Sequence, residues 1–246
     1  MKIALLGYGK MGRSIEQCLM EDQRHQIVLR INSANRTSLT PTTLKYADVV
    51  IEFSDPASVM KNISMCLECE VPIVVGTTGW YKELDNVKQL CIERNGSLVY
   101  ASNFSIGMNI FFEVNRKLAE MMRSQKEYAP EITETHHHEK KDIPSGTAIS
   151  LAKEIIDHSS SGKHWVSSTS SFRPKNFSSS ELIILSHREE NVTGKHSVTY
   201  ISPFDKIEIN HEAFSRVGFA NGALLAAEWI ADKKGFYEFR EILKLL

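Results

Sequence analysis

The run from Glu131 to Ala148 brings together the side chains of this sequence best suited to acid chemistry. It contains three consecutive imidazoles, His136 to His138, and two ammonium groups, Lys140 and Lys141, just before a Ser-Gly-Thr turn at 145–147. A helix that begins at such a turn points free backbone N–H groups at whatever lies in front of it, and its dipole attracts an anion. The run is therefore suited to hold an acidic molecule and to give it a proton.

Two arrangements of the histidine run are open. On a strand, His136 and His138 share one side and His137 faces the other, unless the strand ends there. In the functional interpretation, one imidazole or lysine is the acid, the others form a cationic clamp, and the amides of Gly146 and Thr147 receive a carboxylate. In the alternative, the run is a solvated strand end followed by a serine helix cap. Consecutive histidines do not match the spacing of zinc-binding patterns, so no metal site is predicted.

The N-terminus carries a glycine-rich turn between a predicted strand, Lys2 to Leu6, and a predicted helix from Lys10. The turn, Gly7-Tyr8-Gly9-Lys10-Met11-Gly12, reads GxGxxG. Glycines there permit a tight turn and let a pyrophosphate approach the amides of the helix N-terminus. We therefore expect a dinucleotide site; the alternative is a strand-to-helix turn without a ligand.

Coenzyme choice is set near the end of the second predicted strand, where an Asp or Glu binds the ribose hydroxyls of NAD. This sequence has Asn32 there, followed by Ser33 and the nearby Arg36. No acid is present to repel a 2′-phosphate, so we expect NADPH to be accepted at least as readily as NADH. Arg36 could instead be a solvated loop charge.

Two further loops can reach the nicotinamide half of a dinucleotide, because ligands lie beyond the carboxyl ends of strands in a doubly wound sheet. These loops are Gly76-Thr77-Thr78-Gly79 and Ala101-Ser102-Asn103-Phe104. Gly, Thr and Asn are also common in ordinary turns, so either loop could be free of ligand.

Up to Asn103, short apolar runs alternate with amphipathic stretches, as expected for βαβ units with a buried parallel sheet. Helices are expected to begin near Lys10, at Asp55-Pro56 and near Tyr81. The strands after the first are Ile27 to Ile31, Asp48 to Phe53, Pro72 to Val75 and Ser97 to Ala101.

After Asn103 the sequence predicts a long helix and, beyond Pro144, a second one. Strands then predominate, and the chain ends in helix. The serine-rich stretch from Ser159 to Ser180 is predicted to be a mobile loop. The apolar series of the long helix is Ile106, Ile110, Val114, Leu118 and Met121. The predicted strands are Glu181 to Ser186, His196 to Ile201 and Lys206 to Glu212. The predicted last helices are Ala223 to Ala231 and Phe236 to Leu246.

The composition is that of an ordinary globular chain, with 246 residues, 42% of them hydrophobic, and a formal net charge of -1. This excludes bulk attraction to nucleic acid or to anionic membranes, so a small-molecule substrate is expected. The chain shows no signal peptide and no run of membrane-spanning length, which predicts a cytoplasmic protein.

Cys66 and Cys69 form a CxxC pair at a predicted helix end, where we expect buried structural thiols rather than a redox or zinc pair.

The run from Glu131 to Ala148 resembles the signature of the dihydrodipicolinate reductase family, also called the 4-hydroxy-tetrahydrodipicolinate reductase family. The resemblance spans the chain. It implies that NADPH or NADH delivers a hydride to a cyclic imine dicarboxylate and gives tetrahydrodipicolinate, in the diaminopimelate route to lysine. The other segments that carry it are Gly7 to Arg13, Phe53 to Pro56, Gly76 to Gly79, Ala101 to Gly107, Ser215-Arg216 and Phe219 to Ala223.

The resemblance also implies roles for individual residues. His136 corresponds to the family's proton donor or acceptor histidine, and Lys140 to its proton-donating lysine. His137 corresponds to a substrate contact, and Gly146 and Thr147 to the substrate carboxylate site. The sequence does not decide whether His136 or Lys140 delivers the proton. The expected cofactor contacts, Asn32 from its position and the others from the resemblance, are Gly7, Tyr8, Gly9, Lys10, Met11, Gly12, Asn32, Gly76, Thr77, Thr78, Ala101, Ser102, Asn103 and Phe104.

The implied architecture is an α/β fold: a Rossmann-like doubly wound parallel sheet with an inserted α+β substrate domain that carries a mixed sheet. Residues 1–103 and the C-terminal helices in 216–246 are expected to form the dinucleotide-binding domain. Residues 104–215 are expected to form the substrate-binding and oligomerisation domain of a homotetramer. Closure around both ligands would place hinges near Asn103 and Arg216.

Two other functions stay open. One is another small-substrate NAD(P)-dependent dehydrogenase, acting on an amino or imino acid. The other is a dinucleotide-sensing protein without catalysis, in which the proton-transfer positions would be free to lack His136 and Lys140. The chain departs from the family pattern in its shorter glycine turn, in Asn32 and in the serine-rich stretch, which bear on coenzyme preference and loop motion.

Overall fold

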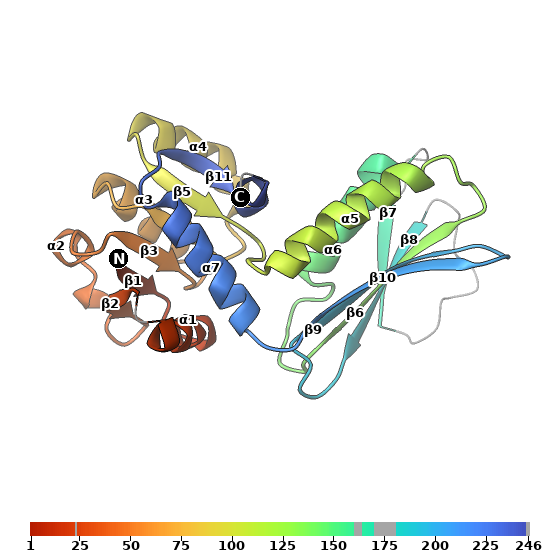
Figure 1. Cartoon of the computed structure of the whole chain (residues 1–246), viewed down its shortest axis with the longest axis horizontal. Helices are drawn as coiled ribbons and strands as arrows, with labels where there is room; N and C mark the ends of the chain where they lie inside the picture. Colours follow the sequence, from red (N-terminus) through yellow and green to blue (C-terminus); the bar gives the residue numbers. More distant parts are fainter. Residues whose placement is uncertain (23, 160–163, 170–180, 245–246) are drawn as a thin grey trace. The chain divides into compact units, whose positions relative to one another are not determined.

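The chain divides into two compact units, both drawn in Figure 1. The first unit comprises Met1–Ile106 and Arg216–Leu246, and the second unit comprises Gly107–Ser215. The second unit is therefore an insertion within the first. The computed structural model describes residues 1–22, 24–159, 164–169 and 181–244.

A six-stranded sheet forms the centre of the first unit. Its strands are β1 (Lys2–Leu6), β2 (Gln26–Ile31), β3 (Val49–Glu52), β4 (Ile73–Val75), β5 (Ser97–Tyr100) and β11 (Gly235–Glu238). They pair in parallel in the order β11-β5-β4-β3-β1-β2. The central strands are buried on both faces; β3, for example, reads VVIE and is buried throughout. Such strands need helices on both sides, which is the doubly wound arrangement.

Two hydrophobic cores fill the two sides of this sheet. One core contains residues of α2, α3 and α4, and the other contains residues of α1, α7 and α8. The helices are α1 (Lys10–Asp22), α2 (Pro41–Leu44), α3 (Val59–Glu68), α4 (Leu84–Glu93), α7 (Val217–Ile230) and α8 (Phe239–Leu243), with 3-10 turns η1 (Arg36–Ser38) and η2 (Tyr81–Glu83).

Helix α7 brings the chain back into the first unit and packs on the parallel sheet. The residues it contributes to the core are Ala220, Ala223, Ala226, Ala227 and Ile230. A Cβ at Gly222 would lie 1.7 Å from the carbonyl oxygen of Phe104, so only glycine allows this approach. The returning helix is thereby tied to the segment through which the chain leaves the unit.

The predicted helix start at Asp55-Pro56 is wrong by three residues. The α-helix begins at Val59. The Asp55 carboxylate instead accepts hydrogen bonds from the Ala57 amide at 3.0 Å and from Ser58 Oγ at 2.8 Å. The carboxylate thus caps a turn that precedes the helix.

The predicted C-terminal helix from Phe236 is also wrong in its first part. Gly235 has a φ of +129°, and the chain continues as β11, which pairs with β5. Helix α8 follows only at Phe239. The short helix α2 and the edge strand β11 were not predicted.

The CxxC cysteines lie at the C-terminal end of α3, as expected. Cys66 is fully buried and Cys69 is 9% exposed, and both thiols are free. Burial raises the pKa of Cys66 well above its usual value. These are properties of core thiols rather than of a redox pair.

The second unit is built on a five-stranded mixed sheet. Its strands are β6 (Ala129–His136), β7 (His164–Ser168), β8 (Glu181–Arg188), β9 (Gly194–Ile201) and β10 (Lys206–Ala213). The order is β10-β9-β6-β8-β7, with β6 and β7 parallel to β8 and the other pairs antiparallel. Helices α5 (Ile106–Met122) and α6 (Gly146–His158) share a hydrophobic core with this sheet (Figure 1).

Two expectations for the second unit need correction. The serine-rich stretch contains strand β7, so it is not one loop, and its residues 160–163 and 170–180 lie outside the described part of the chain. The apolar series that predicted α5 lies mostly on the outer side of that helix, where Ile110 is 58% exposed and Met121 64%. The inner side uses Met108, Phe111 and Phe112 instead.

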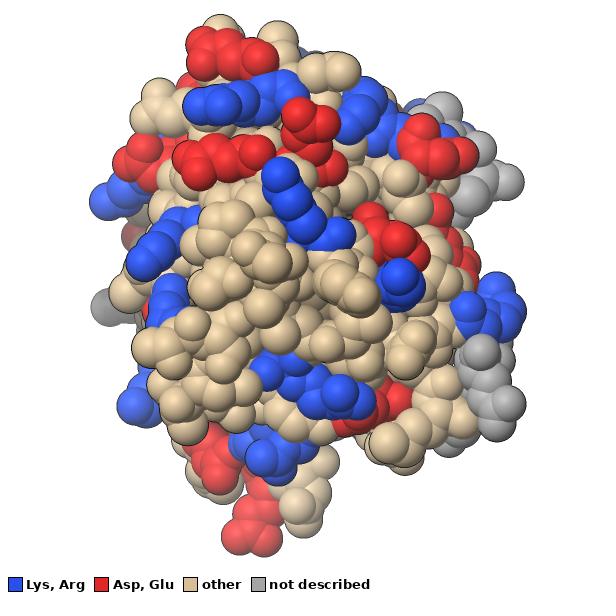
Figure 2. Space-filling model, turned by 90° about the vertical axis from the view of Figure 1, so that its left-hand side faces the viewer, with Lys and Arg blue, Asp and Glu red and all other residues tan. Residues whose placement is uncertain are grey.

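The charged side chains of the first unit show no segregation by sign on the face in Figure 2, where Lys and Arg are interspersed with Asp and Glu. This agrees with the small net charge of -1. In the described parts of the chain, no helix is both long enough and apolar enough to cross a membrane.

Candidate active site

Strand β6 ends at His136, so of the two open arrangements the structure has the one in which the strand ends within the histidine run. His136 is 7% exposed, His137 is partly buried and His138 is exposed. The backbone then turns, and the Lys140 amide donates to the His137 carbonyl at 3.1 Å. This turn begins the loop of residues 137–145, which we call the donor loop.

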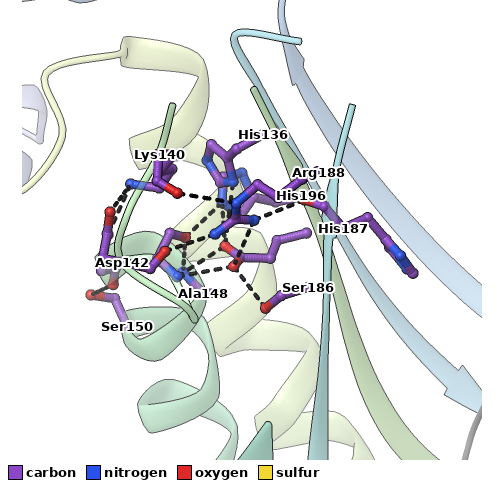
Figure 3. Close-up of polar contacts among 12 residues, drawn as sticks. His136, Lys140, Asp142, Ala148, Ser150, Ser186, His187, Arg188 and His196 are labelled. Atoms are coloured by element: carbon purple, nitrogen blue, oxygen red, sulfur yellow. Dashed lines mark hydrogen bonds and ion pairs between the residues drawn. The ribbon is translucent and has the colours of Figure 1, made fainter. Parts of the chain in front are cut away.

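Lys140 projects from the donor loop and is ion-paired (Figure 3). Its Nζ lies 2.9 and 2.8 Å from the two carboxylate oxygens of Asp142. Although partial burial opposes it, the hydrogen bonds and charge of Lys140 lower the pKa of Asp142. The sequence analysis considered only cationic neighbours here and missed Asp142, although it lies two residues from Lys140.

A fully buried carboxylate, Glu134, underlies this region. Both of its oxygens accept the Ser145 amide, at 3.0 and 3.1 Å, and Oε1 accepts Ser186 Oγ at 2.8 Å. Arg188 Nη1 lies 3.9 Å from Oε1. The sequence analysis gave Glu134 no role. The available signal was an acid two residues before His136, which a strand places on the same face.

Two imidazoles complete a cluster with Glu134. His136 Nδ1 is 3.5 Å and His196 Nε2 is 3.8 Å from Glu134 Oε2, and the two rings pack edge to face with centroids 5.0 Å apart. Burial lowers the pKa of His136 to about 4, although the Glu134 charge opposes the shift. Burial and the neighbouring His136 lower the pKa of His196 to about 3. These lowered pKa values favour the neutral form of both rings at pH 7 in the free protein.

The donor atoms of Glu134, His136 and His196 lie within 4.8 Å of one another, close enough to be considered for a metal ion. Sequence spacing could not reveal this group, because His196 comes from β9. However, the Glu134 oxygens already accept three hydrogen bonds and face the Arg188 guanidinium. A cation would have to displace these partners, so the site fits a hydrogen-bonded cluster better than a metal centre.

The first turn of α6 is open toward a ligand. Ser145 caps the helix as predicted, accepting the Ala148 amide at 3.2 Å. The amides of Gly146 and Thr147 find no acceptor among the described residues, and a Cβ at Gly146 would meet no atom within 4 Å. Two free N–H groups at a helix start suit a carboxylate.

The glycine turn of the first unit fits a dinucleotide. Gly7 has a φ of +96°, and a Cβ there would lie 2.0 Å from the Phe53 carbonyl oxygen. A Cβ at Gly12 would lie 2.8 Å from the Gly7 carbonyl oxygen, whereas Gly9 has open space. The first glycine permits the turn, the third permits close helix packing, and the second leaves room for a pyrophosphate.

Two pockets meet at this turn. One, of about 310 Å³, is lined by Gly7, Tyr8, Gly9, Asn32, Ser33 and Arg36 among others. The other, of about 430 Å³, is lined by Gly9, Lys10, Met11, Gly76, Thr77 and Thr78 among others. Both share Gly9, Phe53 and Ser54. The predicted cofactor residues from the glycine turn, Asn32 and the Gly76 loop are thus brought together.

The Ala101 loop lies outside these pockets. Ala101 and Phe104 are buried in the core, and Phe104 packs on Phe53 and Phe239. Asn103 Oδ1 accepts the Ser105 amide at 2.8 Å, and Ser102 is exposed. The structure of the first unit therefore gives this loop a packing role, and its contact with a cofactor stays a prediction.

Arg36 lines the pocket although its side chain is 42% exposed. It hydrogen-bonds Ser58 and lies 4.0 Å from Asp55. Glu52, which the sequence analysis did not single out, lies fully buried at the end of β3. It accepts hydrogen bonds from Ser54 and Asn62, which line the same pocket.

The first unit has a doubly wound sheet whose GxGxxG turn lies between two adjoining pockets, and the second unit carries the donor loop with Lys140. These features are those of the class of NAD(P)-dependent oxidoreductases. Residues 1–104 match the family model "Dihydrodipicolinate reductase, N-terminus", and residues 107–243 match "Dihydrodipicolinate reductase, C-terminus". The chain belongs to the dihydrodipicolinate reductase family. The predicted family, fold class and NADPH or NADH coenzyme are confirmed.

Individual proteins show the same relationship. The 4-hydroxy-tetrahydrodipicolinate reductase of Christiangramia forsetii is 43% identical over 244 residues, covering 99% of this chain and 98% of that protein. The enzyme of the same name from Methanosarcina acetivorans is 36% identical, covering 81% and 74%. The solved dihydrodipicolinate reductase from Paenisporosarcina sp. TG-14, with dipicolinate bound, has a TM-score of 0.74 at 21% identity and covers 98% of this chain and 99% of that one. The last comparison shows a shared fold.

Proposed function

We propose that this chain reduces 4-hydroxy-tetrahydrodipicolinate, or dihydrodipicolinate, to tetrahydrodipicolinate in the diaminopimelate route to lysine. The observation that carries the proposal is the convergence of Lys140, His136 and the open amides of Gly146 and Thr147 around one loop. A dianionic ring needs both a cation and amide donors, and this loop supplies both.

Lys140 is the proton donor in this proposal. The bound NADPH or NADH supplies a hydride to the substrate ring, and the negative charge that forms there must be met by a proton. Burial holds the pKa of His136 at about 4, so that ring carries no proton to give at neutral pH in the free protein. Lys140 is 23% exposed and paired with Asp142, from which it can turn to the substrate. His136 then either orients the substrate or serves as a proton acceptor.

The substrate carboxylates are received by the start of α6 and by His137. The Paenisporosarcina protein binds dipicolinate, a planar dicarboxylate, which supports a ligand of this class. One carboxylate would accept the Gly146 and Thr147 amides. Arg188, which is close to Glu134, adds positive charge to the same region.

The coenzyme is NADPH or NADH, with NADPH accepted at least as well. Asn32 and Arg36 line the pocket where the adenosine ribose is expected, and the end of β2 carries no acid. Arg36 is positioned to meet a 2′-phosphate.

The enzyme works in the cytoplasm as a homotetramer assembled through the sheet of the second unit. The tetramer is what the resemblance to the family implies. Light scattering that gives a monomer mass would contradict the tetramer.

The decisive assay supplies dihydrodipicolinate from a coupled synthase and follows the loss of NADPH and NADH separately. Turnover with one or both coenzymes is expected. Oxidation of neither coenzyme, while both bind, would favour a dinucleotide-sensing protein. Turnover with other imino acids but not with this substrate would favour a different dehydrogenase.

A further inference from the structure

We propose that the ion pair of the partly buried Arg188 and the fully buried Glu134 is a positioning pair for this reaction, holding the donor loop and the first turn of α6 in one fixed arrangement. The inference rests on the proposed function, in which the donor loop carries the proton and α6 receives a carboxylate. Neither member of the pair was predicted from the sequence, and each reaches residues far from it along the chain.

Arg188 fixes the middle of the donor loop. It ends strand β8, opposite His136 in the parallel ladder. Its Nη2 donates to the Asp142 carbonyl at 2.7 Å and its Nε to the Lys140 carbonyl at 3.3 Å (Figure 3). The planar guanidinium fork thereby binds the backbone of both members of the Lys140–Asp142 ion pair. A lysine side chain could not reproduce this geometry.

Glu134 fixes the end of the same loop. Its two oxygens share the amide of Ser145, the residue that caps α6. The carboxylate is completely buried, and such a charge persists only when it is paired and hydrogen-bonded. Ser186 and Arg188 provide that compensation. Removing the Arg188 charge would leave the buried Glu134 carboxylate with neutral hydrogen-bond donors but without a cation.

Glu134 also acts on His136. The groups that face this ring are Glu134 on β6, Lys140 and Asp142 on the donor loop, Arg188 on β8 and His196 on β9. His136 Nδ1 points to Glu134 at 3.5 Å and makes no hydrogen bond with any described residue. Catalytic hydrogen bonds are often long before substrate binds and tighten afterwards. Glu134 is therefore placed to orient His136 and to favour its protonated form.

The two members of the pair predict different kinetic signatures. Arg188→Lys keeps the charge beside Glu134 but loses the bonds to the loop carbonyls, so kcat should fall roughly 10- to 100-fold through displacement of Lys140. Its pH profile should keep the wild-type shape.

Glu134→Gln keeps an acceptor for the Ser145 amide but removes the anion facing His136. It should raise the KM for the dicarboxylate and move the pH-profile limb that belongs to His136 to lower pH.

The experiment measures kcat, KM and pH profiles for both variants, beside Glu131→Gln on the same strand as the control. NADPH affinity and thermal unfolding test whether each variant is folded; unchanged NADPH binding is expected, because the cofactor pockets lie in the first unit. Kinetic constants of both variants within about two-fold of wild type, or losses no larger than those of Glu131→Gln, would overturn the proposal. So would activity lost only in proportion to the unfolded fraction.

Calorimetric binding of dipicolinate separates this inference from the proposed function. If the wild-type protein binds dipicolinate and Glu134→Gln binds it more weakly than Arg188→Lys does, the positioning role of Glu134 stands even if turnover of the natural substrate is absent. If Glu134→Gln binds dipicolinate as tightly as the wild-type protein, Glu134 does not position the carboxylate site, whatever the activity.

Discussion

The cofactor turn and the donor loop are both built around short glycine- or histidine-rich motifs, but they are positioned by different means. The cofactor turn is shaped by backbone: a φ of +96° at Gly7, a close carbonyl at Phe53 and open space at Gly9. The donor loop is shaped by charged side chains from strands of the sheet, chiefly the buried Glu134 on β6 and the partly buried Arg188 on β8. A backbone-defined site can be recognised locally, whereas a side-chain-defined site depends on contacts across the fold.

The largest expected effect tests the chemistry of the donor loop. Lys140→Ala should lower kcat by roughly 10²–10⁴-fold, as for a lost proton-transfer group, with a smaller effect on KM. Steady-state kinetics with the coupled substrate measure this. His138→Ala is the control, because His138 is exposed in the same run. Near-normal turnover of the Lys140 variant would remove it from the mechanism and shift the proton transfer to His136.

The next prediction tests whether the cofactor turn is set by its backbone. Gly7→Ala places a side chain at positive φ and against the Phe53 carbonyl, which should destabilise the protein by about 2–5 kcal/mol. Gly9→Ala meets no atom, so it should leave unfolding nearly unchanged but weaken NADPH binding. Urea unfolding and NADPH fluorescence titration distinguish the two. Equal stability of both variants would contradict the backbone explanation.

A smaller effect is expected from crowding His136. A Cβ at Gly194 would lie 3.2 Å from His136 Nε2, so Gly194→Ala should push the ring by a few tenths of an ångström and lower kcat by roughly ten-fold. Gly146→Ala is not a suitable control, because it touches the carboxylate site; Gly218→Ala, which has open space, is. An unchanged kcat would mean that the position of His136 is not critical.

The last prediction concerns stability against pH. The pKa values of His136 and His196 in the folded protein, about 4 and about 3, lie below their usual value of 6.5. The contribution of each neutral ring to the free energy of unfolding is therefore complete above pH 6.5. It is lost as the pH falls toward 4 for His136 and toward 3 for His196, by up to about 1.4 kcal/mol per pH unit for each ring. Urea unfolding across this range should show a shallower pH dependence in His196→Gln than in wild type. His138→Gln should match wild type.

The parts of the fold that sequence predicts are those with local causes. Strand β1, the glycine turn and α6 were recognised from an apolar run, the GxGxxG spacing and a serine cap. Strand β11 was missed because its reason to be a strand is pairing with β5, more than a hundred residues away along the chain. The edge strand β7 was missed for the same reason, since it depends on β8.

The candidate site divides in the same way. Lys140, His136 and the Gly146 turn were identified from a single run of sequence. Glu134 lies in that run, but its meaning depends on Ser186, 52 residues away. Arg188 was given no role from the sequence, because its hydrogen bonds to the donor loop span 46 and 48 residues. No spacing rule connects such residues.

The return of α7 has a consequence for synthesis on the ribosome. Part of one face of the parallel sheet, including Val49 and Val99, shares its core with helix α7, which is translated only after the whole second unit. The nascent N-terminal segment therefore exposes that apolar face while the insertion emerges. A chaperone that shields apolar strands would be most needed during this interval, before the last helices arrive to close the first unit.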